Sequence, residues 1–288
     1  MSFTVACAQF APEKARIEAN LDRIADLIVQ ASAEDADLVV FPETATTAYF
    51  LEGGVVESSI SKETLFEKLA TRLKGRLTKP ADAVVGFYEV EGGNLYNSAA
   101  YLEFGGQSDR VVHVYKKFFL PTYGVFDEER FVSRGHDLGV FDTRLGRMGI
   151  LICEDIWHSI LPTLCAAAGA LTLIVPSASP ARGFEGPQIG NLEHYIQMTR
   201  AVSQEHGVYC VNCQLTGFEG GKGFVGGSSV TDPSGKIVAK GPVGEEHLLL
   251  APIDLDMVVV ARAALPLIAD LQSAWQDIRR LVAELEPR

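Results

Sequence analysis

Three residues with reactive side chains stand near the ends of apolar, strand-like segments: Glu43, Lys117 and Cys153. Ligands of open α/β sheets usually bind at the carboxyl ends of the strands, so these positions are suited to chemistry. Cys153 ends the segment MGILIC and precedes a helix-like run, and a helix N-terminus favours the thiolate. A thiolate is a nucleophile that attacks carbonyl carbon. Since a lone cysteine in an apolar run is more often a core residue, the hypothesis depends on all three residues.

The segments that must position these residues alternate between strand and helix patterns. Strands are predicted over 4–10, 37–43 and 111–118, and a hairpin over 140–144 and 147–153. A helix over 13–33 has apolar residues at spacings of four, three and four, so strand, helix and strand form a parallel βαβ unit. The whole pattern predicts an α/β fold with mixed sheets in a single domain of residues 1–288. Further strands are predicted over 83–90, 95–104, 171–176, 208–214, 228–232, 237–239 and 247–253, and further helices over 62–77, 157–168, 190–206 and 257–288.

Three local motifs surround the same residues: VVFPE at Glu43, YKKFFLP at Lys117 and GILICED at Cys153. In order and spacing they resemble the Glu–Lys–Cys triad of the nitrilase superfamily of carbon–nitrogen hydrolases, and the resemblance covers most of the chain. The family pattern selects Lys117, and strand alternation directs Lys116 to the opposite face. The resemblance implies a four-layer α-β-β-α sandwich of the nitrilase type. It also implies a homodimer or higher homo-oligomer, with the tail from about residue 257 packing on a neighbour.

The resemblance implies a role for each residue. Cys153 is expected to attack an amide carbonyl carbon and form a thioester, with Glu43 as general base and later as acid toward the leaving amine. Lys117 is expected to stabilise the oxyanion together with the backbone N–H of Glu154. Glu128, in the segment FDE, matches a second glutamate of many members and is expected to orient Lys117 or the hydrolytic water.

The neighbours of the cysteine indicate a substrate class. The segments CEDIW and LPTYGVFDEERF resemble the glutaminase domain of glutamine-dependent NAD synthetases. In that group the residues matching Tyr123, Glu154 and Ser179 help to bind glutamine. The group has a basic residue six positions after the serine, where this chain has Glu185, and Arg182 is a candidate substitute. We therefore expect an amidohydrolase that releases ammonia from a small carboxamide, glutamine-like or other.

Several alternatives stay open. A nitrilase is disfavoured by Glu154, where tryptophan is expected, and an N-carbamoyl amidohydrolase shares the same fold. The chain has no S-G-G-x-D nucleotide motif, so a glutaminase subunit of a separate synthetase is another reading. A catalytically silent scaffold that binds a partner is the last. A papain-like Cys–His pair leaves Glu43 and Lys117 unexplained.

The amino-acid composition limits the classes of partner and the cellular location that we expect for the protein. The 288 residues are 47% hydrophobic, enough for a sizeable core, and the net charge is −12 without a basic stripe. This charge argues against nucleic acid and against an anionic membrane surface. No run of about 18 apolar residues predicts a membrane span, and the N-terminus shows no signal-peptide pattern. A cytoplasmic protein is expected.

The remaining motifs predict no cofactor. Five cysteines scattered through apolar segments favour reduced thiols. Cys210 and Cys213 have C-x-x-C spacing, but on a strand they face opposite sides, so we expect core residues and no metal. The segment 221–226, GKGFVG, matches G-x-G-x-x-G outside the required strand-to-helix context. It is therefore expected to be part of a mobile glycine-rich loop over 217–227, and not a phosphate site.

Overall fold

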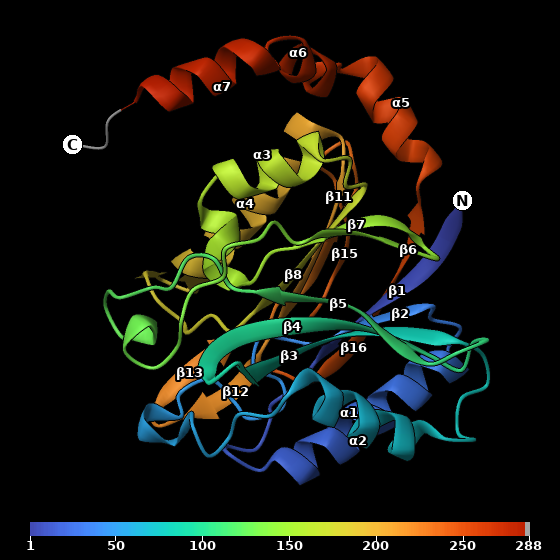
Figure 1. The fold of residues 1–288 in the computed structure, drawn as a ribbon, viewed down its shortest axis with the longest axis vertical. Helices are drawn as coiled ribbons and strands as arrows, with labels where there is room; N and C mark the ends of the chain where they lie inside the picture. The colour runs from blue at the N-terminus through green and yellow to red at the C-terminus, as the bar shows by residue number, and fades with distance from the viewer. Residues whose placement is uncertain (286–288) are drawn as a thin grey trace.

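The computed structural model describes residues 1–285, except the side chain of Glu52, and contains two six-stranded sheets packed face to face (Figure 1). The first sheet has the order β16-β1-β2-β3-β4-β5, with β1, β2 and β3 parallel and the other pairs antiparallel. Its central strands are apolar nearly throughout because both faces are covered. The strands are β1 (Ser2–Gln9), β2 (Leu38–Val40), β3 (Ala81–Glu91), β4 (Asn94–Phe104), β5 (Arg110–Lys116) and β16 (His247–Asp254).

The second sheet has the order β15-β14-β11-β8-β7-β6, with a parallel centre formed by β7, β8 and β11. Two short hairpins lie outside the sheets, one between β9 and β10 and one between β12 and β13. The strands are β6 (Val140–Thr143), β7 (Gly146–Ile150), β8 (Thr172–Ser177), β9 (Phe184–Glu185), β10 (Gln188–Ile189), β11 (Tyr209–Gln214), β12 (Thr216–Glu219), β13 (Lys222–Val225), β14 (Ser229–Thr231) and β15 (Ile237–Lys240).

Helices cover the outer face of each sheet (Figure 1). The predicted apolar stripe of the first helix is confirmed, since Leu21, Ile24 and Ile28 are fully buried. The α-helices are α1 (Ile17–Ala33), α2 (Lys62–Leu73), α3 (Ile160–Ala167), α4 (Gly190–His206), α5 (Asp256–Ala264), α6 (Leu267–Ser273) and α7 (Trp275–Glu284). Three 3₁₀ helices are η1 (Glu52–Gly54), η2 (Glu128–Arg130) and η3 (Cys153–Trp157).

Three apolar clusters separate the four layers. The inner cluster lies between the sheets and includes Val5 of β1 and Val211 of β11. An outer cluster joins the first sheet to α1 and α2, and another joins the second sheet to α3 and α4. Because side chains alternate along a strand, each sheet supplies two clusters: Val5 faces inward, whereas Ala6 lies in the outer cluster. The predicted four-layer α-β-β-α sandwich is therefore confirmed.

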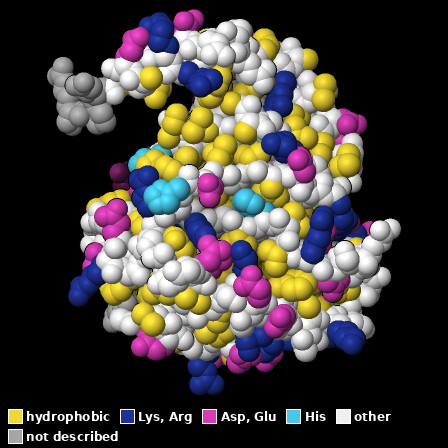
Figure 2. Space-filling view, in the orientation of Figure 1, with side chains coloured by type: hydrophobic (Ala, Val, Ile, Leu, Met, Phe, Trp, Pro, Cys, Tyr) yellow, Lys and Arg dark blue, Asp and Glu magenta, His cyan; other side chains and the backbone are white. Residues whose placement is uncertain are grey.

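The C-terminal tail is helical from residue 256, close to the predicted start, and residues 286–288 of the predicted helix lie outside the described residues. Ile268 of α6 packs into the cluster beneath α3 and α4. Helix α7 buries none of its residues and projects from the body, where Figure 2 shows apolar side chains on the tail. The oligomer expected to cover this face stays a prediction. No helix among residues 1–285 has the length and apolar character needed to span a membrane.

Several predicted boundaries of strands and helices were wrong because local backbone geometry made the elements begin later or end earlier than expected. The strand predicted over 37–43 ends at Val40, ahead of Pro42, which has no N–H for a ladder. The first helix begins at Ile17 and not at residue 13, since Ala15 has φ +57°. The helix predicted to residue 77 ends at Leu73, shortly before Gly75 with φ +72°. The helix predicted from residue 157 begins only at residue 160, after η3.

The glycine-rich segment 217–227 was predicted to be a mobile loop, and this was wrong. It contributes most of an antiparallel hairpin, β12 paired with β13. Gly220 and Gly221 both have positive φ and form its two-residue turn, so the glycines serve the hairpin. The G-x-G-x-x-G match lies largely on β13 and is followed by β14, not by a helix.

Candidate active site

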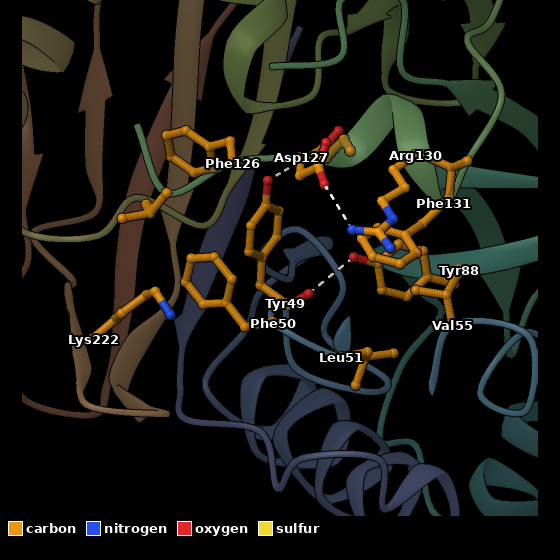
Figure 3. A pocket seen from close by; sticks show the side chains of 13 residues that line it. Tyr49, Phe50, Leu51, Val55, Tyr88, Phe126, Asp127, Arg130, Phe131 and Lys222 are labelled. Carbon is orange, nitrogen blue, oxygen red and sulfur yellow. Dashed lines mark hydrogen bonds and ion pairs between the residues drawn. The ribbon is translucent and has the colours of Figure 1, made fainter. Parts of the chain in front are cut away.

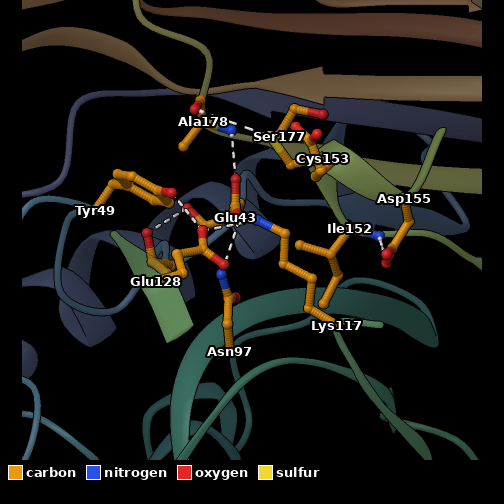
Figure 4. A network of polar contacts seen from close by, with 12 residues as sticks. Glu43, Tyr49, Asn97, Lys117, Glu128, Ile152, Cys153, Asp155, Ser177 and Ala178 are labelled. Carbon is orange, nitrogen blue, oxygen red and sulfur yellow. Dashed lines mark hydrogen bonds and ion pairs between the residues drawn. The ribbon is translucent and has the colours of Figure 1, made fainter. Parts of the chain in front are cut away.

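Glu43 lies in a turn three residues after β2 and is fixed by partners from both sheets. Its Oε1 accepts hydrogen bonds from Asn97 Nδ2 of β4 at 2.8 Å and from Lys117 Nζ at 2.7 Å. Its Oε2 accepts the backbone N–H of Ala178 at 2.9 Å, just after β8. The turn can approach β3 this closely because residue 86 is glycine, where a Cβ would lie 2.9 Å from the Cα of Glu43. The carboxylate is 1% exposed and held at both oxygens (Figure 4).

Lys117 follows the last residue of β5 and is buried between two carboxylates. Its Nζ donates to Glu43 Oε1 and to Glu128 Oε1, each at 2.7 Å. Burial alone lowers the pKa of Lys117, but Glu128 and Glu43 reverse this and raise the pKa well above its ordinary value. A fixed cation therefore stands in the site at every physiological pH. The neighbouring Lys116 faces outward and pairs with exposed Glu91, as alternation predicted.

Glu128 occupies the first position of η2 and is buried. Its Oε1 accepts from Lys117 and from the hydroxyl of Tyr49, whereas its buried Oε2 has no hydrogen-bond partner among residues 1–285. Burial raises the pKa of this carboxyl to about 7, with Glu43 adding to the rise and Lys117 opposing it. The contact places Glu128 against Lys117, and its role in orienting that lysine stays a prediction. A carboxyl that titrates near neutral pH is also suited to exchange protons with a water molecule.

Replacing Glu128 by glutamine is expected to flatten the pH dependence of stability. The unfolded carboxyl has a pKa of about 4.5 and the folded one of about 7, so the folded state holds more protons between these values. Stability from this group is thus complete below about pH 4.5 and is lost as the pH rises through about 7. The wild-type unfolding free energy should fall by up to about 3 kcal/mol more than that of the variant across this window. Urea unfolding of both proteins at about pH 4.5 and about pH 7 measures the difference. An equal change in unfolding free energy between these pH values for the two proteins would contradict the prediction.

Cys153 begins η3 with a left-handed backbone, φ +50°, which turns its side chain out of the line of β7. Its Sγ lies 3.1 Å from the hydroxyl of Tyr195 and 3.9 Å from the carbonyl oxygen of Ala178. Burial and Glu43 raise the pKa of Cys153 well above its ordinary value, despite the opposing Lys117. The short 3₁₀ helix does not offset the cost of burying charge. The resting thiol is therefore protonated and requires a base.

Asp155 ties this turn to the segment that follows Lys117. Its Oδ2 accepts the backbone N–H of Ile152 at 3.0 Å and the hydroxyl of Tyr115 at 2.9 Å, and its Oδ1 accepts the N–H of Phe119 at 2.8 Å. One buried carboxylate thus sets the backbone on both sides of the site. Burial raises its pKa to about 6. Sequence reasoning assigned no role to this residue, although an acid within an apolar strand-to-helix junction was a usable signal.

The residues predicted to bind substrate lie at two depths. Tyr123 is 46% exposed, and its hydroxyl donates to Glu154 Oε2 at 2.9 Å, so these two are brought together. The guanidinium of Arg182 lies over the ring of Tyr123 at 5.8 Å and over that of Phe126 at 5.0 Å. Ser179 is buried and accepts a hydrogen bond from Asn191 Nδ2 at 2.6 Å, and Oδ1 of the same Asn191 accepts the backbone N–H of Arg182 at 2.8 Å.

A cavity of about 300 Å³ adjoins the site behind Tyr49 (Figure 3). Tyr49 and Glu128 line it, whereas Cys153, Lys117 and Glu43 do not. The hydroxyl of Tyr88 donates to the backbone carbonyl of Tyr49 at 3.0 Å and fixes this aromatic wall. The cavity is therefore separated from the thiol by the Tyr49–Glu128 contact.

The structure gives no support for a metal site in the residues that it describes. Among residues 1–285, no cluster of three or more His, Cys, Asp or Glu side chains is arranged to bind a metal ion. Cys210 lies in the cluster beneath α3 and α4, whereas Cys213 lies in the inner cluster. The prediction that these two cysteines face opposite sides of a strand is confirmed.

Known proteins share this combination of fold and motifs. The sequence profile of the carbon-nitrogen hydrolase family matches residues 4–263. The chain belongs to the carbon-nitrogen hydrolase family. The glutamine-dependent NAD(+) synthetase of Acinetobacter baylyi is 31% identical to this hydrolase over 256 residues, which cover 88% of this chain and 45% of that protein. The resemblance seen in the sequence motifs is thereby confirmed.

Solved structures agree with this assignment. The glutamine-dependent NAD+ synthetase from Acinetobacter baumannii superposes with a TM-score of 0.78 at 31% identity, covering 90% of this hydrolase and 47% of that chain. Saccharomyces cerevisiae Nit3, a member of branch 10 of the nitrilase superfamily, superposes with a TM-score of 0.77 at 26% identity, covering 92% and 95%. The hydrolase spans about half the length of the curated relatives it matches.

Proposed function

We propose that this carbon-nitrogen hydrolase is a cysteine-dependent amidase that releases ammonia from a small carboxamide. The observation that carries the proposal is the position of Ala178, whose backbone N–H donates to Glu43 and whose carbonyl oxygen lies 3.9 Å from the Sγ of Cys153. One residue directly after β8 thus contacts both the carboxylate and the thiol, and the ammonium group of Lys117 is hydrogen-bonded to the same carboxylate. Base, nucleophile and cation thus meet in one buried site (Figure 4).

Acylation follows from this arrangement. Glu43 takes the thiol proton as Sγ attacks the carbonyl carbon, which forms the C–S bond and moves an electron pair onto the oxygen. Lys117 and the backbone N–H of Glu154 stabilise that oxyanion. Protonated Glu43 then donates its proton to the departing nitrogen, the C–N bond breaks, and ammonia leaves a thioester on Cys153.

Deacylation uses the same groups a second time. Glu43 accepts a proton from a water molecule while the water oxygen attacks the thioester carbon. Collapse of the second tetrahedral intermediate breaks the C–S bond, and the proton returns to the sulfur. The products are a carboxylic acid and the resting thiol. A nucleophilic thiol and four further buried free cysteines favour a reducing compartment, in keeping with the expected cytoplasmic location.

The mouth of the site favours an amino-acid amide such as glutamine. Glu154 offers a carboxylate to a substrate ammonium group, and Tyr123 fixes that carboxylate by its hydrogen bond. Arg182 offers a guanidinium to the substrate carboxylate, and its buried Nε has no hydrogen-bond partner in the described part of the chain. The names of relatives such as the Acinetobacter baylyi synthetase also refer to glutamine, and this carries over here only as support for the proposal.

Replacing Arg182 by glutamine is expected to separate substrates by their charge. The kcat/KM for glutamine should fall by about tenfold or more, the usual effect of removing a hydrogen bond to a charged group. Hydrolysis of a short aliphatic amide without a carboxylate should change little. Arg130→Gln is the matched control, because Arg130 is largely exposed and faces Asp127 at 3.7 Å. Equal losses on both substrates would show that Arg182 acts on the fold and not on the substrate.

The test of the function is ammonia release from glutamine, asparagine, short aliphatic amides, N-carbamoyl amino acids and nitriles. Release from an amide identifies the amidase, and release from nitriles alone or from carbamoyl compounds alone identifies one of the alternatives. We favour a stand-alone amidase over an ammonia-supplying subunit, so the chain should turn over without a partner. No release from any compound contradicts the stand-alone amidase.

A further inference from the structure

Tyr195 of α4 makes the shortest polar contact with the thiol of Cys153 among residues 1–285, and the mechanism above does not use it. It is 2% exposed, and its hydroxyl lies 3.1 Å from the Sγ of Cys153. Its ring meets that of Trp157 edge-on at 5.4 Å between centroids, and Trp157 belongs to η3, the same 3₁₀ helix that Cys153 begins. Trp157 in turn stacks on His194, the residue before Tyr195. The phenol is therefore fixed relative to the nucleophile by packing on both sides.

We propose that Tyr195 is a positioning residue that orients the Sγ of Cys153 and stabilises its thiolate by donating a hydrogen bond. The proposal rests on the proposed function, in which Cys153 loses its proton to Glu43. The only other hydrogen-bond partner of Sγ in residues 1–285 is the carbonyl oxygen of Ala178, which can only accept. The carbonyl oxygen can accept a hydrogen bond from the thiol but repels the thiolate. A phenol hydroxyl can accept a hydrogen bond from the thiol and can donate one to the thiolate. Tyr195 thus serves both protonation states without moving.

The charges around the sulfur make this donor necessary. Glu43 from the turn after β2 raises the pKa of the thiol, Lys117 from the end of β5 lowers it, and Tyr195 from α4 also lowers it. Tyr49, in the segment between β2 and η1, also faces the thiol of Cys153. It remains neutral because burial raises its pKa well above the ordinary value. Burial, followed by the negative charge of the thiolate, likewise raises the pKa of Tyr195, so the phenol keeps its proton throughout the cycle.

Tyr195→Phe tests the proposal, since it keeps the ring against Trp157 and removes only the hydroxyl. The readout is the rate of alkylation of Cys153 by iodoacetamide as a function of pH, with the modified residue located by mass spectrometry. Loss of a hydrogen bond to a charged group should lower the rate constant at pH 7 by about tenfold or more and move the profile to higher pH by about one unit. Tyr209→Phe is the matched control, because Tyr209 is buried and its hydroxyl bonds only to the backbone of Asp254.

A second variant keeps the test valid if Tyr195→Phe folds poorly. Incorporation of 3-fluorotyrosine at position 195 preserves the shape of the ring and makes the phenol a stronger donor, so the profile should move to lower pH. A purely structural tyrosine would produce no such shift. An unchanged profile in both variants overturns this inference and leaves the amidase proposal standing. Lack of any pH-dependent alkylation of Cys153 in the wild-type chain overturns both.

Discussion

Replacement of Cys153 by alanine is expected to lower the rate of ammonia release by about 10⁴-fold or more, the loss typical of removing a catalytic nucleophile. In the proposed mechanism Cys153 alone carries the acyl group, whereas Glu43 and Glu128 are both hydrogen-bonded to Lys117. The left-handed backbone at residue 153 is equally unfavourable for cysteine and alanine, so the free energy of unfolding should change by only about 1 kcal/mol.

The matched control for this variant is Cys165→Ala. Cys165 is also a fully buried free thiol, but it lies on α3 in the cluster between that helix and the second sheet. Its removal should affect stability and leave ammonia release intact. The second measurement is mass spectrometry of the wild-type chain quenched during turnover, in which the acyl group should be found on Cys153 alone. Undiminished turnover by Cys153→Ala would exclude the thioester mechanism, whatever the substrate.

The sequence predicted the layers of this fold because each element carries its periodicity in a short window. The stripe of Leu21, Ile24 and Ile28 is visible within one helix, and it faces the sheet as expected. Element ends were less predictable, since they depend on single backbone angles, such as the φ of +57° at Ala15. The hairpin of β12 and β13 was missed because glycines at its turn and on its strands resemble a loop in composition.

The sequence predicted the three central residues of the site but not the hydrogen bonds that hold them in place. Motifs around Glu43, Lys117 and Cys153 named the side chains, but their partners come from distant segments. Asn97 of β4 reaches Glu43 only when the strands of the first sheet pair, and the backbone N–H of Ala178 reaches it only when the two sheets pack. The pKa of Cys153 depends on the fold in the same way: local sequence shows a helix start, which favours the thiolate, whereas burial raises the pKa most and is a property of the whole fold.

Replacement of Lys117 by alanine is expected to impair stability and catalysis together. The variant leaves the carboxyl groups of Glu43 and Glu128 buried without the cation that both contact. Breaking a buried charge pair in this way costs about 3–5 kcal/mol. Turnover should also fall by about 10²–10³-fold, because an oxyanion donor is lost. Lys116→Ala is the control from the adjacent position, where a partly exposed pair with Glu91 is worth about 0–1 kcal/mol.

The pH dependence of the Lys117→Ala defect separates electrostatic from packing effects. Lys117 opposes the rise in the pKa of Glu128, so its removal raises that pKa further above the unfolded value of about 4.5. The folded variant then holds an extra proton up to a higher pH, and its stability falls more steeply as the pH increases. Urea unfolding should therefore show a larger deficit at pH 8 than at pH 5. A deficit independent of pH would mean that the variant suffers only from a cavity, and that the buried carboxyls do not depend on this lysine for their charge.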